Sequence, residues 1–244
     1  MISPPLPTTP AESRPDAALP VRQRLLRVTS RLVYRHGVSA TGVASITAAA
    51  GVAKMSLYRH FPGGKDELVA AALADQSERA VTHLIGAARS TAAARANAAE
   101  ATGPAPAGTP PAGGDPAGGD PAGTDPAGTD PVAVVLAIFD VIDATTQRPG
   151  WHGCPFLNAA AELPEDHPGR AVVLAYKEQL RTHLTGLLRE AGATKEAADR
   201  LAKVLLLLYQ GAMSAGGLTP AERPGLLARS VAADLLAREF PPAA

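Results

Sequence analysis

Residues 39–68 read SATGVASITAAAGVAKMSLYRHFPGGKDEL, and the pattern of this stretch decides the fold that we expect. Small and apolar residues predict a short helix from Val43 to Ala50, and a second helix is predicted from about Lys54 to His60. Gly51 lies between them, and glycine tolerates the backbone angles that a tight reversal between close helices requires. The stretch therefore predicts a helix-turn-helix unit.

The second helix of this unit carries a polar surface. It combines cations for phosphates with hydrogen-bonding and apolar groups for base edges, which a helix in the DNA major groove needs. Two alternatives stay open, because Tyr58 could pack against the helix base and His60 could be a satisfied cap. The candidate DNA-binding residues on this helix are Lys54, Met55, Ser56, Tyr58, Arg59 and His60.

Charge is distributed unevenly along the chain. The 23 Lys and Arg residues balance 23 Asp and Glu residues, so the formal net charge is zero. Residues 21–65, however, contain eight Lys and Arg and no acidic residue, whereas residues 66–244 carry a net charge of −7. Such a basic face can be merely solvated, but this one coincides with the helix-turn-helix. A basic segment joined to an acidic remainder is typical of a nucleic-acid-binding module.

The segments GVAKMSLYRHF and GGKDEL, in this order, resemble the DNA-binding signature of the tetracycline-repressor (TetR) family of bacterial transcription regulators. The resemblance covers about Arg22 to Leu73, and the FPGGK sequence is similar to that of one subgroup of the family. It implies an all-α protein with an N-terminal three-helix DNA-binding head. A C-terminal helical domain for ligand binding and dimerisation would follow.

The resemblance also assigns contacts with DNA phosphates. It implies that the Tyr58 hydroxyl and the Lys65 ammonium group contact phosphates. Thr41 lies just before the helix predicted to start at Val43, where a hydroxyl can cap the helix. A helix N-terminus also attracts phosphate, so Thr41 either caps the helix alone or contacts DNA as well.

Composition predicts the division of the chain. Residues 1–20 are rich in proline and poor in apolar residues, which predicts a disordered arm. We expect the helix-turn-helix domain in residues 21–67 and the regulatory and dimerisation domain in residues 68–244. Residues 97–130 include the repeat PAGGD-PAGGD-PAGTD-PAGTD, which predicts a disordered surface loop.

Helical periodicity predicts the other helices, and no convincing strand pattern is present, so the expected fold class is all-α. An N-terminal helix is expected from Val21 to about Gly37, and a long helix from Lys65 to about Arg95. The C-terminal domain should contain Pro131–Thr146, with Asp130 as its cap, and then Ala171–Ala191, Lys195–Ala215 and Pro224–Phe240.

The last two predicted helices are the expected dimer interface. The sequence VLLLLY at residues 204–209 is apolar all round, and such a helix must be covered on every side. The resemblance implies a homodimer through these two helices. Two recognition helices that act jointly would read a palindromic operator in double-stranded DNA.

Six residues are candidates for a ligand cavity in the C-terminal domain. Pockets are mostly apolar with a few polar groups, and the resemblance implies a small, apolar effector. Core packing is the alternative for each residue alone. Cys154 is expected to be a small buried side chain rather than a redox sensor. The candidate ligand-binding residues are Phe139, Trp151, Phe156, Asn158, Tyr176 and Met213.

Other functional classes find little support in the sequence. We find no catalytic constellation and no trusted metal-ligand spacing, so we expect no enzyme, metal or cofactor. There is no apolar run of roughly 18 residues, so we expect no membrane partner and a cytoplasmic location. We expect a one-component repressor relieved by its ligand. The alternatives are an all-α carrier or enzyme with an incidental basic head, and a ligand-independent DNA binder.

Overall fold

The computed structural model describes residues 18–101 and 129–241, and every regular element within these ranges is a helix. The predicted all-α fold class is therefore confirmed. Before the gap lie α1 (Val21–Ala40), α2 (Val43–Ala50), α3 (Lys54–His60) and α4 (Gly64–Ala101). After it come α5 (Pro131–Thr146), α6 (Pro155–Glu162), α7 (Pro168–Glu190), α8 (Lys195–Ala215), the short 3-10 helix η2 (Pro220–Glu222) and α9 (Pro224–Glu239).

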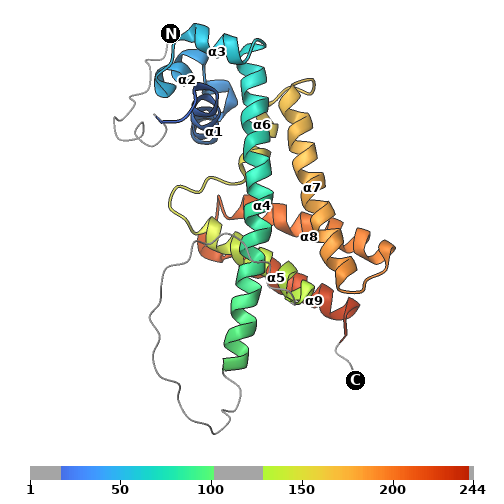
Figure 1. Cartoon of the computed structure of the whole chain (residues 1–244). Helices are drawn as coiled ribbons and strands as arrows, with labels where there is room; N and C mark the ends of the chain where they lie inside the picture. The colour runs from blue at the N-terminus through green and yellow to red at the C-terminus, as the bar shows by residue number, and fades with distance from the viewer. Residues whose placement is uncertain (1–17, 102–128, 242–244) are drawn as a thin grey trace.

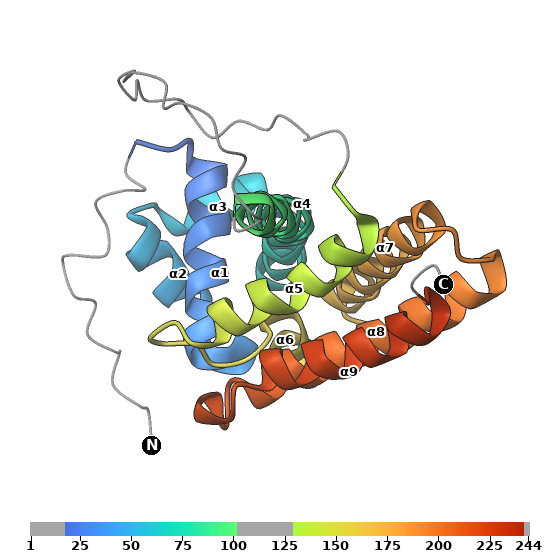
Figure 2. The same cartoon turned by 90° about the horizontal axis from the view of Figure 1, so that it is seen from below.

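The long helix α4 is the axis of the molecule (Figure 1). Helices α1–α3, which we call the head, lie beside its N-terminal end, and α5 and α7 pack along the rest of it. Helices α8 and α9 run side by side along one edge, with α5 between them and α4 (Figure 2). We call α5–α9 the body, and α4 joins it to the head.

Two separate clusters of buried apolar side chains hold the head and the body. The head cluster includes Leu57 and Phe61, and it continues into α4 through Leu68 and Ala72. The body cluster contains Val38 of α1, Val69 and later residues of α4, and the helices α5–α9. The first turns of α4 thus pack with both the head and the body, and a domain boundary at residues 67–68 stays a prediction.

Helix α1 contains a break near its end, where Gly37 has a φ of 82°. A short helical turn then continues to Ala40, beyond the end that we expected. A Cβ atom at Gly37 would clash with the carboxylate of Glu162, the last residue of α6. That carboxylate accepts the backbone N–H of Ser39 at 2.9 Å. The glycine therefore permits a direct contact between the head and the body.

Helices α2 and α3 have the predicted bounds. Gly51 between them adopts a left-handed conformation, with φ 60° and ψ 43°, as the sequence pattern required. Its N–H donates to the carbonyl of Ala48, and the N–H of Val52 donates to that of Thr47. These bonds satisfy the last carbonyls of α2 and fix the angle at which α3 leaves it.

Helix α4 is longer than we predicted. It ends at Ala101, so residues 97–101, which we placed in the loop, are helical. Their alanines favour helix, which explains the extension. The repeat up to residue 128 and residues 1–17 of the predicted arm lie outside the described residues. The Asp130 carboxylate accepts the N–H groups of Val132 and Ala133, so the predicted cap of α5 is confirmed.

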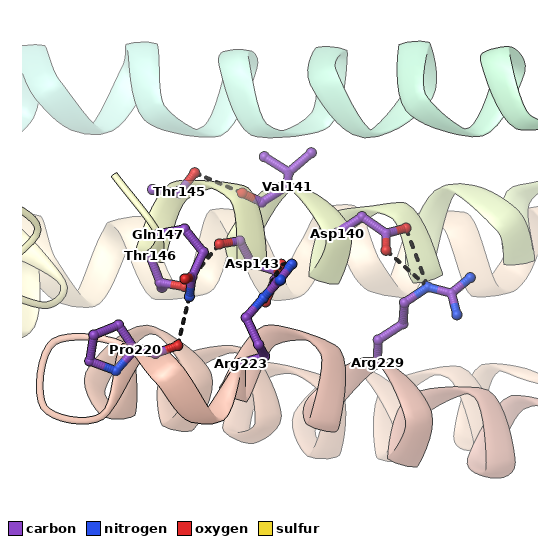
Figure 3. Close-up of polar contacts among 9 residues, drawn as sticks. All are labelled: Asp140, Val141, Asp143, Thr145, Thr146, Gln147, Pro220, Arg223 and Arg229. Carbon is purple, nitrogen blue, oxygen red and sulfur yellow. Dashed lines mark hydrogen bonds and ion pairs between the residues drawn. The ribbon is translucent and has the colours of Figure 1, made fainter. Parts of the chain in front are cut away.

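Ion pairs fix α5 to its neighbours (Figure 3). The Asp143 side chain is only 5% exposed and accepts both Nε and Nη2 of Arg223, with Nε 3.0 Å from Oδ1. Arg223 has a φ of 50° and immediately precedes α9. Asp140 pairs with Arg229 of α9 at 3.2 Å and with Arg95 of α4 at 2.7 Å. Two carboxylates thus hold α5 in place.

The body differs from the sequence prediction mainly around α6. We did not predict this helix, which consists of the sequence PFLNAAAE. Pro168, expected in a loop, begins α7, where its missing N–H breaks no helical bond. Helix α8 has the predicted bounds, and α9 ends one residue before the predicted end. None of the described helices has the length and apolar character of a membrane span.

Candidate DNA-binding surface and ligand cavity

Helix α3 lies at the outer end of the head (Figure 1), and most of its polar residues are exposed. Its inner side is anchored by Leu57, which is fully buried, and by Phe61, which follows it and is 1% exposed. On the other side, Met55 is 72% exposed and Tyr58 is 37% exposed. The remaining predicted residues of α3 are Lys54, Arg59 and His60, which are exposed, and Ser56, which is half-buried. None of the six is buried, in contrast to Leu57.

The turn after α3 positions the Tyr58 ring. Gly64 has a φ of 73°, and a Cβ atom there would lie 3.4 Å from Cε1 of Tyr58. The N–H of Gly63 donates to Oε2 of Glu67 at 2.7 Å. The two glycines of FPGGK therefore let α4 start directly against the tyrosine whose hydroxyl is the candidate phosphate ligand.

Thr41 does not belong to this exposed surface. It is 2% exposed, and its hydroxyl donates to the carbonyl of Gly37 at 2.7 Å. The residue that caps α2 is Gly42, which has no side chain to accept a bond. The predicted hydroxyl cap is therefore wrong, because Thr41 turns back to the break in α1. We leave Thr41 out of the candidate DNA-binding surface.

Lys65 is half-buried, and its ammonium group already has a partner. The Nζ atom donates to the carbonyl of Val38 at 2.6 Å. This carbonyl lies in the last turn of α1, where helix carbonyls lack an intrahelical partner. In this structure Lys65 therefore ties α4 to α1. The ammonium group has two further N–H donors, so the expected phosphate contact stays a prediction.

A cavity of about 170 Å³ lies in the body, bounded by α4–α8. Four of the six predicted ligand residues line it: Trp151, Phe156, Tyr176 and Met213. The rings of Phe156 and Tyr176 stack with their centroids 3.9 Å apart. The Trp151 indole N–H donates to the carbonyl of Met213 at 3.4 Å. The cavity thus has aromatic walls of fixed orientation.

The other two predicted residues, Phe139 and Asn158, do not line this cavity. Phe139 is 1% exposed within the body cluster, because α5 turns its side chain away from the cavity. Asn158 is exposed, and its amide donates to the carbonyl of His152 at 2.9 Å, which holds the turn before α6. The structure therefore does not bring these two residues together with the other four, and a role for them in ligand binding stays a prediction.

Sequence analysis missed the wall contributed by α4. Gln76, Ala80 and His83 line the cavity at spacings of four and three residues, so they share one face of the helix. The available signal in the sequence was that the polar residues Gln76 and His83 share a helix face with apolar residues. Tyr209 was also missed, and its hydroxyl lies 2.8 Å from that of Tyr176. In Figure 3, Val141 and Thr145 of α5, which also line the cavity, point toward α4.

Burial favours the uncharged forms of two tyrosines and one cysteine in the cavity. Desolvation raises the pKa of the Tyr176 and Tyr209 hydroxyls, and it also raises the pKa of the Cys154 thiol. Cys154 is 3% exposed and lines the cavity. A protonated, buried thiol is a poor nucleophile, which fits the packing role that we predicted. The cavity therefore offers aromatic faces and neutral hydrogen-bonding groups to a ligand.

Metal binding has no support in the described residues, where no three His, Cys, Asp or Glu side chains come together as ligands.

The fold and these two sites define a class of protein. It is an all-α helix-turn-helix protein whose head is joined by one long helix to a body that contains a cavity. Residues 25–72 match the model of bacterial regulatory proteins of the tetR family, and residues 131–216 match the C-terminal domain of LmrA/YxaF-like transcriptional regulators. The chain belongs to the TetR family.

Individual relatives agree with this assignment. The HTH-type transcriptional regulator LmrA of Bacillus subtilis is 39% identical over 57 residues, which are 23% of this chain and 30% of LmrA. YxaF of the same organism is 41% identical over 64 residues, which are 26% of this chain and 33% of YxaF. The chain thus matches only about a third of each of these curated relatives.

Solved structures of similar proteins extend the likeness to the whole described chain. A TetR-type transcriptional regulator of Streptomyces avermitilis has a TM-score of 0.67 and 27% identity, covering 91% of this chain and 98% of its own. The TetR-family regulator SCO4454 of Streptomyces coelicolor has a TM-score of 0.67 and 28% identity, covering 90% and 96%. Head and body therefore both have counterparts in regulators of this family.

Proposed function

We propose that this protein is a transcriptional regulator that binds a palindromic operator in double-stranded DNA and has no enzymatic activity. The observation that carries the proposal is the outward surface of α3. Helix α3 exposes Lys54, Tyr58 and Arg59. The buried side chains of Leu57 and Phe61 anchor it to the core of the head. Such a helix can enter a major groove without disturbing the core of the head. DNA as the partner implies a location in the cytoplasm.

The proposed regulator acts as a homodimer through α8 and α9. Leu207 of α8 is 68% exposed, and Leu227 and Val231 of α9 are 67% and 40% exposed. Large apolar side chains on two adjacent helices favour a protein partner. A second copy that covers them would supply the second recognition helix that a palindromic operator requires. The exposed leucines therefore support the same function as α3.

The proposed regulator is a repressor that a small effector releases from DNA. The aromatic cavity beside α4 supports this part of the proposal, because an occupant there would touch the helix that carries the head. A ligand shifts the balance between two conformations only by its different affinity for them. An effector would thus favour a conformation in which the two α3 helices no longer fit the operator.

The first test is a titration of labelled DNA from the region upstream of the protein's own gene, with random duplex as competitor. We expect saturable binding that survives the competitor. Replacing Tyr58 or Arg59 with Ala should weaken this binding about tenfold or more, because each substitution removes a DNA contact. Gln179→Ala is the control, because Gln179 is an exposed residue of α7, outside both the head and the two helices of the proposed dimer interface.

Thermal unfolding separates DNA contact from folding in these variants. Both α3 side chains are exposed, so the melting temperature should hardly change. A large drop in melting temperature with intact DNA binding would show that they serve the fold instead.

A further inference from the structure

A second hollow adjoins the aromatic cavity. Its volume is about 270 Å³, and it lies between α1, α4 and the segment that precedes α6. Gln76, Trp151 and Pro155 line both hollows, so the two hollows adjoin at these three residues. The aromatic cavity alone is smaller than the roughly 300 Å³ at which ligand pockets begin, but the two hollows together exceed this size.

The two hollows differ in chemistry. The inner one is the aromatic cavity, whose tyrosines and cysteine stay uncharged because burial raises their pKa values. The residues that line the outer one include Arg148, Gln76 and Tyr34. Among the described residues, no Asp or Glu lines either hollow. The outer hollow therefore offers a cation and neutral donors, which suits an anionic group.

The outer hollow lies where the head meets the body. Tyr34 belongs to α1, and its hydroxyl accepts the backbone N–H of His152 at 2.8 Å. Its ring lies 6.2 Å from that of Trp151 and 5.8 Å from that of His152, measured between centroids. The yellow segment that carries these two residues lies against the end of α1 (Figures 1 and 2). An occupant of the outer hollow would thus touch the head directly.

We propose that the effector is an amphiphile with an anionic end, and that it occupies both hollows at once. Its apolar part lies in the aromatic cavity, and its carboxylate or comparable anion lies against Arg148, Gln76 and Tyr34. This assignment rests on the proposed function, because it takes the cavity as the effector site. It adds the class of effector and a point of action on α1. The anion accepts the Tyr34 O–H, while the Tyr34 oxygen still accepts the N–H of His152. A bound effector thus contacts α1 and the body together, and its occupancy biases the position of the head.

Trp151 provides the readout for a test, because it is the only tryptophan of the chain and lines both hollows. The probes are 6-phenylhexanoate and 6-phenylhexan-1-ol, which share an apolar part and differ in the anionic end. Titration of the full-length protein should change the Trp151 fluorescence, with the acid binding about tenfold more tightly than the alcohol.

Two variants locate the anion. Arg148 is exposed, so Arg148→Gln should leave the fold intact. It should remove the preference for the acid while the affinity for the alcohol stays the same. Tyr34→Phe keeps the ring and loses the hydroxyl, so it should weaken binding of the acid more than that of the alcohol. Arg200→Gln, on the far side of the body, should preserve the preference.

The outcomes separate this inference from the proposed function. Equal affinities for acid and alcohol, an unchanged preference in Arg148→Gln, or no binding of either probe would overturn the inference, whatever the protein does with DNA. If the acid also weakens DNA binding by the wild type but not by Arg148→Gln, the site and its action on the head are both supported. Failure of the wild type to bind DNA would reject the proposed function alone, because the fluorescence titration does not depend on DNA.

Discussion

Gly64 shows how one residue places a side chain that we propose as a DNA contact. Its positive φ lets α4 begin within van der Waals distance of the Tyr58 ring. Thr41 and Lys65 show the opposite case, in which side chains expected on DNA are used inside the protein. Thr41 satisfies a carbonyl at the break in α1, and Lys65 satisfies another in its last turn. Both bonds depend on Gly37, whose φ ends the regular part of α1.

The first prediction at this scale concerns Gly64→Ala. A side chain at a positive φ costs about 1 to 2 kcal/mol, so the free energy of unfolding should fall by that amount. DNA affinity should fall as well, because the new methyl group presses on Tyr58. Urea unfolding and the DNA titration measure the two effects.

Gly86→Ala is the matched control in the same helix. Gly86 lies inside α4 with open space around its Cα, so alanine should stabilise the protein by about 0.5 to 1 kcal/mol. If both substitutions stabilise the protein, the conformation of Gly64 is not the constraint that we describe.

The second prediction concerns the buried hydroxyls of Tyr176 and Tyr209. Burial raises both pKa values above the value of about 10 in the unfolded chain. Above pH 10 the unfolded state releases protons that the folded state keeps, so stability is constant below this pH and falls above it. Each tyrosine contributes a loss of up to about 1.4 kcal/mol per pH unit.

Urea unfolding between pH 9 and 11 checks this slope. The variant with Phe at both positions should lose stability less steeply over the same range. Parallel curves for the wild type and this variant would contradict the burial of the two hydroxyls.

At the scale of helices, the sequence predicted those whose ends are determined locally. Helices α2 and α3 are separated by Gly51, and α8 follows Thr194, whose hydroxyl accepts the N–H of Ala197. Helix α6 was missed because it is only eight residues long and depends on packing between α1 and α7. The cavity wall of Gln76 and His83 was missed for a related reason. Which face of α4 meets α5–α8 depends on tertiary contacts that a single sequence does not specify.

The third prediction concerns the ion pairs that hold α5 against α9. Arg223→Ala leaves the buried Asp143 carboxylate without its cation, whereas Arg229→Ala leaves Asp140 paired with Arg95. An unpaired buried charge is strongly unfavourable. The urea midpoint should therefore fall clearly in Arg223→Ala and change little in Arg229→Ala. Equal effects of the two substitutions would mean that the burial of Asp143 does not matter.

At the scale of the whole molecule, the body presents apolar side chains along one edge. Helices α8 and α9 form this edge (Figure 2), and Leu207 and Leu227 are largely exposed on them. The apolar run of α8 in the sequence indicated that such a surface exists. The sequence could not show which of these side chains are exposed, because this depends on how α5 and α7 cover the other sides of the helix.

The fourth prediction belongs to this scale: Leu227→Glu should convert the dimer into a monomer. In a symmetric interface, the new carboxylate lies either against the same carboxylate of the partner or against apolar side chains, where it loses its water. Both situations are unfavourable. Analytical ultracentrifugation should show the smaller species, and DNA affinity should fall because each monomer carries a single α3. Circular dichroism should remain that of a helical protein. A variant that sediments as the wild type does would contradict an interface at α9.

Helix α4 has 38 residues, so it is about 57 Å long at a rise of 1.5 Å per residue. A rod of that length that pivots by one degree about one end moves the other end by about 1 Å. A hydrogen bond tolerates only a few tenths of an ångström before it weakens. Under the proposed function, a tilt of α4 that is too small to disturb the packing of the body would therefore displace the head by more than a base contact tolerates.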